Sequence, residues 1–300
     1  MRRFLLFLWI SSLFLVAIVV SNNGVQGQNQ DTYSLQLQGF AWNRLSLNTL
    51  VVTADNESWW NPDYVNIMLR AIGQWNEAIA AFSSNHSDFS YLSSLKIQST
   101  VSNQSQMGFD IYVNWIESPL SSTSNEVGLS RISSNGQRAI INCSINLAVH
   151  NNHGDVLSEG DLQSVALHEL GHSLGLGHGN YTGDLMYSNY NIGSSAKAVS
   201  TLDVYAVATL FAWEANSTSF YPINRWLKEN TVVLPSDIKY QSLPVSPQNA
   251  SPETLLNNPI VQTLIFMFGV LIHPEFLALV LVVIVIFVIV ALIPKRRRNP

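Results

Sequence analysis

Residues 168–178 read His-Glu-Leu-Gly-His-Ser-Leu-Gly-Leu-Gly-His, a pattern of residue types that favours a metal site. His168 and His172 are four residues apart, so on an α-helix their imidazoles lie on one face, one turn apart. Gly175 is a natural position for that helix to end and the chain to reverse, which can bring His178 back as a third ligand. Three imidazoles leave one position of a tetrahedral Zn²⁺ open for water, as in catalytic zinc sites.

Glu169 follows His168 directly but points about 100° around the helix, so it flanks the metal rather than binding it. Zinc lowers the pKa of a bound water, and a neighbouring carboxylate can accept the proton as that water attacks a peptide carbonyl. The sequence therefore predicts Glu169 as the catalytic base beside three zinc ligands, His168, His172 and His178.

These residues resemble the motif of the metzincin metalloproteases, His-Glu-x-x-His-x-x-Gly-x-x-His followed by a methionine turn. Every fixed position is filled, and Asp184-Leu185-Met186-Tyr187 is the candidate for the turn. Within the metzincins the chain is most similar to the matrixins, many of which have a proline where this chain has Ser188.

The resemblance implies a zinc-dependent endopeptidase that acts on peptide or protein substrates, with Met186 supporting the zinc site. It also implies an α+β fold of the metzincin type, in which a mixed, twisted sheet carries a zinc-binding helix. Matrixins commonly bind structural calcium, but calcium ligands cannot be assigned in this sequence.

The N-terminal end has the features of an export signal. Arg2 and Arg3 precede an uncharged, apolar run, and small residues follow near residue 27. We expect residues 1–27 to form a secretory signal peptide, with an uncleaved N-terminal anchor as the alternative.

The C-terminal end predicts attachment to a membrane. Residues 260–294 are strongly apolar, and the uncharged stretch 276–293 is long enough to span a bilayer, so terminal hydrophobic helices are expected. The basic tail, residues 295–300, favours a cytoplasmic C-terminus and hence a surface-exposed domain. Pro274-Glu275-Phe276 resembles archaeal sorting signals, which would make a sorting enzyme a partner; a permanent anchor is the alternative.

Charge and cysteine usage fit an exported domain. The chain carries a net charge of −5, and much of its basic character lies in the two ends, so the middle is acidic. Such a charge argues against nucleic-acid binding, which needs a basic face. Cys143 is the single cysteine, so an intramolecular disulfide is excluded, and its alternating surroundings place it in a strand core.

We expect one peptidase domain over residues 34–213, followed by a Ser-, Asn- and Pro-rich linker over residues 214–259. Apolar periodicity predicts a helix that begins near Asn61. Alternation and β-branched residues predict strands over residues 44–55, 94–101, 109–115 and 137–149. Ser158 and Ser200 are expected to cap two further helices, with Asp161 and Asp203 at the capping-box positions.

Two shorter segments allow different interpretations. Residues 127–130 are either an ordinary loop or, by the matrixin resemblance, the sheet edge above the cleft to which an extended substrate adds. His150, His153 and Asp155 are expected to form a solvent-facing loop rather than a metal site, because they offer only two imidazoles.

Two alternatives to a general endopeptidase share the same motif. In the first, zinc only stabilises a non-catalytic surface or adhesion module, although zinc binding alone does not need Glu169. In the second, the protein is a maturation peptidase of narrow specificity, which shares the chemistry but does not cleave proteins in general.

Overall fold

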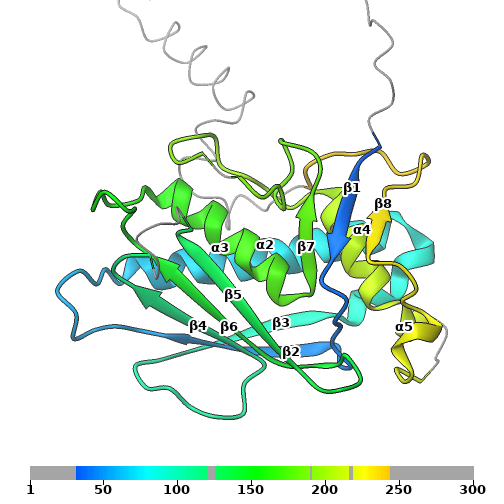
Figure 1. Ribbon diagram of the computed structural model, residues 1–300, viewed down its shortest axis with the longest axis horizontal. Coiled ribbons are helices and arrows are strands. Elements are labelled where there is room, and N and C mark those ends of the chain that lie inside the picture. The colour runs from blue at the N-terminus through cyan, green and yellow to red at the C-terminus, as the bar shows by residue number, and fades with distance from the viewer. Residues whose placement is uncertain (1–31, 120–125, 190, 216–218, 244–300) are drawn as a thin grey trace, which may run out of the picture. The chain divides into compact units, whose positions relative to one another are not determined.

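The computed structural model describes residues 32–119, 126–189, 191–215 and 219–243. The larger of its two sheets has five strands and is mixed, as the resemblance to metzincins implied (Figure 1). Three of its strand pairs are parallel and the edge strand β5 is antiparallel to β6. The strands follow the order β3 (Lys96–Ser102), β2 (Ser46–Val52), β4 (Ile111–Ile116), β6 (Ile140–Ala148), β5 (Gly128–Ser134).

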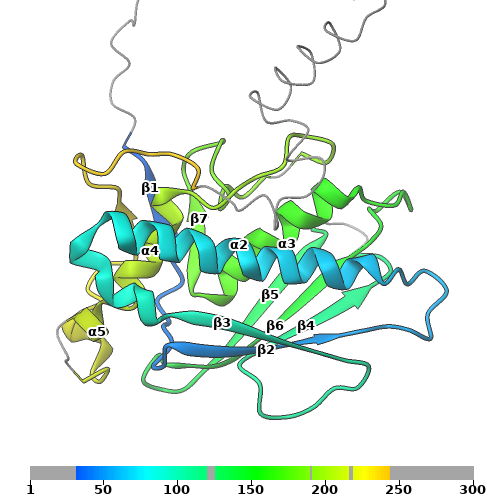
Figure 2. The same ribbon diagram turned by 180° about the vertical axis from the view of Figure 1, so that it is seen from behind.

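Two long helices, α2 (Asp63–Asn85) and α3 (Glu159–Ser173), cover one face of this sheet (Figures 1 and 2). The apolar stripe expected on α2 is buried, with Trp75 at its centre. The Trp75 indole N–H donates to the Leu167 carbonyl at 2.9 Å and so ties α2 to α3. In β4 the alternate residues Ile111, Val113 and Trp115 are buried, which is the period of a strand with one covered face.

Both predicted capping serines are confirmed, but only the second forms a complete capping box, because the Asp161 carboxylate accepts from the Ser158 hydroxyl instead of its backbone N–H. The Ser158 hydroxyl accepts from the backbone N–H of Asp161 at 3.1 Å at the start of α3. Ser200 and Asp203 form a complete capping box at the start of α4 (Thr201–Leu210). These bonds satisfy N–H groups that the first turn of a helix leaves without intrahelical partners.

A second, three-stranded sheet holds the chain that follows α3. Its order is β7 (Leu176–Gly179), β1 (Ser34–Leu37), β8 (Thr231–Val233), and both pairings are antiparallel. The remaining elements are short and lie around these layers; they are η1 (Ser87–Ser94), α5 (Ala212–Ala215) and η2 (Ile223–Arg225).

The linker predicted over residues 214–259 overlaps the folded unit. Residues 219–243 belong to the folded unit, because β8 pairs with β1 and the Leu243 N–H donates to the Val199 carbonyl at 2.8 Å. The Ser, Asn and Pro content suggested a linker, but such short segments are fixed by long-range pairing rather than by composition.

The predicted signal peptide (residues 1–27), membrane segments (260–294) and basic tail (295–300) lie outside the described residues. None of the helices within the described ranges combines the length and hydrophobicity that crossing a bilayer requires.

The turn between α3 and β7 depends on Gly175, which has a φ of +99°. A Cβ there would lie 2.7 Å from the Phe40 carbonyl oxygen, a backbone atom that cannot move aside cheaply. We predict that Gly175→Ala lowers the free energy of unfolding by more than about 2 kcal/mol, because it adds a clash to the strain of a positive φ.

Gly154 is the matched control, since its φ is +84° but a Cβ there would meet nothing within 4 Å. Gly154→Ala therefore bears the backbone strain alone, about 1 kcal/mol. Urea unfolding of both variants measures the difference in their free energies of unfolding. Equal losses of this free energy would show that the contact with Phe40 is unimportant.

Candidate metal centre

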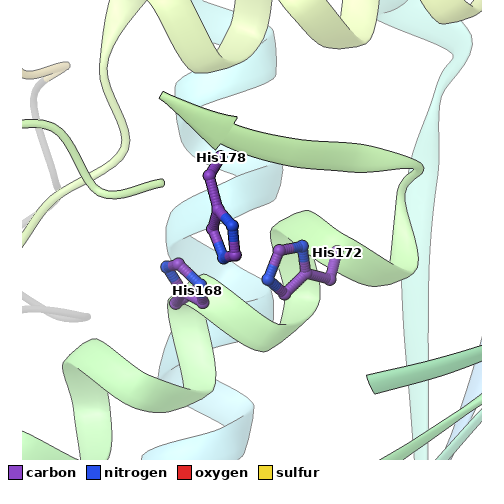
Figure 3. Close-up of side chains that lie close together, drawn as sticks. All are labelled: His168, His172 and His178. Carbon is purple, nitrogen blue, oxygen red and sulfur yellow. The ribbon is translucent and has the colours of Figure 1, made fainter. Parts of the chain in front are cut away.

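The three predicted ligands come together at the end of α3. His168 and His172 lie one turn apart on that helix, and His178 reaches them from β7 (Figure 3). The ring centroids are 4.6 Å apart for His168 and His172, 4.9 Å for His172 and His178, and 5.5 Å for His168 and His178. One nitrogen from each ring lies within 4.8 Å of the others, close enough for all three to hold one metal ion.

Backbone carbonyls fix the tautomers of the two helix histidines. His168 Nδ1 lies 2.8 Å from the Leu185 carbonyl oxygen, and His172 Nδ1 lies 2.8 Å from the Leu176 carbonyl oxygen. A carbonyl can only accept, so each Nδ1 carries the proton and each Nε2 keeps its lone pair for a metal.

Burial keeps these rings uncharged. It lowers the pKa of His168 to about 4 and that of His172 to about 3, and it also lowers the pKa of the more exposed His178. Neutral imidazoles are the form that binds a metal ion, so the donor set fits zinc.

Gln38, which directly follows β1, is a neighbour of His172 that the sequence did not predict. Its side-chain amide donates to the Leu176 carbonyl at 2.8 Å, the same oxygen that accepts from His172. The amide nitrogen is also 3.2 Å from His172 Nδ1, but both atoms are donors, so Leu176 is the shared acceptor. No local pattern links residues so far apart along the chain.

Glu169 lies beside the histidines and is only 5% exposed. Its Oε2 atom is buried and has no hydrogen-bond partner among the described residues. Burial raises the pKa of this carboxyl to about 7. A buried oxygen without a partner is costly, so its presence in a cleft points to a ligand or water that it would bind.

The histidines and Glu169 open onto one cleft with a volume of about 800 Å³. Residues 126–130 form one wall. Of the two interpretations of residues 127–130, the structure has the sheet edge, because Gly128–Ser130 belong to the edge strand β5. Residues 187–189 and Ile192, which follow the turn at Met186, form another.

The turn at Met186 is bonded to both elements that carry the ligands. Its Leu185 carbonyl accepts from His168, and the Met186 carbonyl accepts from the Gly179 N–H at 2.8 Å. The Met186 side chain is fully buried and its sulfur packs against Gly171 of α3. These three contacts hold the turn at Met186 against α3 and β7, which is where the matrixin resemblance expects it.

A family model described as Matrixin matches residues 42–212. No curated protein matches the chain.

We predict that the purified full-length protein retains zinc on dialysis, and that His172→Ala loses it because two imidazoles remain. His153→Ala is the control, because His153 is exposed in the loop where Asn151 accepts its backbone N–H at 2.8 Å. Elemental analysis reports the metal content, and zinc retained by His172→Ala but lost by His153→Ala would place the metal elsewhere.

Proposed function

The chain belongs to the matrixin family of zinc metalloendopeptidases, and we propose that His168, His172 and His178 hold the catalytic zinc while Glu169 activates the attacking water. The observation that carries the role of Glu169 is its buried Oε2 atom, which has no hydrogen-bond partner among the described residues although the side chain lines the cleft. The three imidazoles beside it fit the metal.

His168, His172 and His178 would hold the zinc, which would supply a Lewis acid that makes a water molecule more acidic. Glu169 takes the proton onto its carboxylate as the water oxygen attacks the peptide carbonyl, and then gives that proton to the departing amine nitrogen. A pKa near neutrality suits a group that must both accept and release a proton.

The substrate is proposed to bind as an extended strand along β5. This strand is at the edge of the sheet and forms a wall of the cleft, so its outer backbone groups can pair with a peptide. Gly128 brings β5 close to the base, since a Cβ there would lie 2.5 Å from Glu169 Oε1. A substrate strand paired with β5 would thus lie beside the base.

We also propose that the domain acts outside the cell and is attached to the membrane through residues 260–294. Support comes from the apolar ends and the basic tail in the sequence. The mass of the mature protein would show whether the span is retained or is removed by a sorting enzyme at Pro274-Glu275-Phe276.

Glu169→Gln should retain zinc and lose about 100- to 10,000-fold in peptide hydrolysis, because it removes the base but not the ligands. Cleavage of a quenched-peptide library by the full-length protein, with and without a zinc chelator, measures this. Unchanged turnover would remove Glu169 from the mechanism. Bound zinc without cleavage of any peptide would favour a narrow maturation peptidase or a non-catalytic module.

Gly128→Ala should lower kcat by about 100-fold with zinc retained, because the added methyl displaces the Glu169 carboxylate from its working position. Gly136→Ala is the matched control on the turn between β5 and β6, where a Cβ would meet nothing within 4 Å. Equal activity of both variants would show that β5 does not position the base.

A further inference from the structure

The last described residues, 239–243, lie beyond the matrixin match and are hydrogen-bonded to the start of α4. The Thr201 N–H donates to the Gln241 carbonyl at 2.9 Å, and the Gln241 N–H donates to the Thr201 hydroxyl oxygen at 3.1 Å. The same hydroxyl donates to the Lys239 carbonyl at 2.9 Å, and Ser242 forms a bridge with Ser200. We name residues 239–243 the C-terminal strap.

The strap places one side chain against a buried carboxylate. The Tyr240 hydroxyl donates to Asp184 Oδ2 at 3.0 Å, and the Ser200 hydroxyl donates to the same oxygen at 2.7 Å. Asp184 is 0% exposed, so protein donors must replace the water that its carboxylate has lost. Burial, followed by the charge of Asp184, raises the pKa of Tyr240, so this hydroxyl keeps its proton and remains a donor.

Asp184 in turn holds the methionine turn. Its Oδ1 atom accepts from the Met186 N–H at 2.9 Å. The neighbouring Leu185 carbonyl is the acceptor of His168 Nδ1, and the Met186 carbonyl bonds to Gly179, the residue after His178. A continuous series of hydrogen bonds thus runs from Tyr240 through Asp184 to the turn that supports two of the three histidines.

Two other ionisable groups, Asp203 and Lys197, interact with this carboxylate. Asp203 is fully buried at the start of α4, and burial followed by the charge of Asp184 raises its pKa, which favours the neutral carboxyl beside Asp184. Lys197 also feels the charge of Asp184, but its ammonium group donates to the Thr182 carbonyl at 2.6 Å. The hydrogen bonds to Asp184 come from the Met186 N–H, the Ser200 hydroxyl and the Tyr240 hydroxyl, and of these donors Tyr240 lies outside the matched region.

We propose that Tyr240 is a positioning residue of the zinc site, which acts through Asp184 to fix the turn at Met186 and hence the acceptor of His168. This inference rests on the proposed zinc site. It implies that the C-terminal strap is part of the catalytic unit, although it follows the region that the family shares.

The test compares Tyr240→Phe with Tyr91→Phe in the full-length protein. Tyr91 is the matched control, because its partly buried hydroxyl donates to the Ala208 carbonyl at 2.9 Å, near the other end of α4. Each variant loses one hydroxyl oxygen atom and the hydrogen bonding of that hydroxyl to the protein. Only Tyr240→Phe removes a bond that leads to the methionine turn.

Three readouts are measured for each variant: the urea midpoint, the zinc affinity by competition with a chromogenic chelator, and the visible absorption spectrum of the Co²⁺-substituted protein. We expect Tyr240→Phe to weaken zinc binding by up to about tenfold, the lower end of the effect of removing a residue bonded directly to a metal ligand, and to change the cobalt spectrum. Tyr91→Phe should leave both unchanged, even if its urea midpoint falls equally.

An equal zinc affinity and an equal cobalt spectrum in both variants would overturn the inference, since Tyr240 would then serve stability alone. In an Asp184→Ala background, Tyr240→Phe should cause no further loss of zinc affinity, because the bond that it removes is already absent. An additive loss there would contradict the route through Asp184.

If Tyr240→Phe does not fold, Thr201→Val loosens the strap without changing Tyr240 and should weaken zinc binding in the same direction. No loss of zinc affinity in a folded Thr201→Val protein would overturn the inference. A wild-type protein that binds no metal would instead contradict the proposed function itself.

Discussion

The structure depends on one constraint: three imidazoles must present their free nitrogens to a common point, and the Nδ1–H groups of the two on the helix must be satisfied elsewhere. α3 alone positions His168 and His172 but supplies no acceptor for either Nδ1. The acceptors are the carbonyls of Leu185 and Leu176, which lie beyond the helix. Both segments must therefore be held against α3, and the smaller sheet, the turn at Met186 and the start of α4 do so.

Two buried carboxylates near the cleft have opposite surroundings. Asp184 accepts from Met186, Ser200 and Tyr240, which satisfies its charge and makes it a structural anchor. Glu169 has an oxygen without a partner among the described residues, and its pKa is raised to about 7 by burial. The residue type is nearly the same, but the donors around it determine whether a carboxylate supports the site or is available for chemistry.

The sequence predicted those parts of the site that local geometry controls. The spacing of His168 and His172, the reversal at Gly175 and the caps at Ser158 and Ser200 follow from helical period and backbone conformation, and all are present. It did not predict β1, β8 or the role of Gln38. Those strands have only three or four residues, too few for a periodic signal, and their partners lie far along the chain. The bond between Tyr240 and Asp184 was hidden for the same reason.

The most direct test of the account is X-ray absorption at the zinc edge of the purified full-length protein, which reports the atoms bound to the metal. The account predicts scattering from three imidazoles with Zn–N distances of about 2.0–2.1 Å, and an oxygen in the remaining position. A sulfur ligand at about 2.3 Å, or a fourth protein ligand that closes the site, would contradict an open catalytic zinc held by His168, His172 and His178.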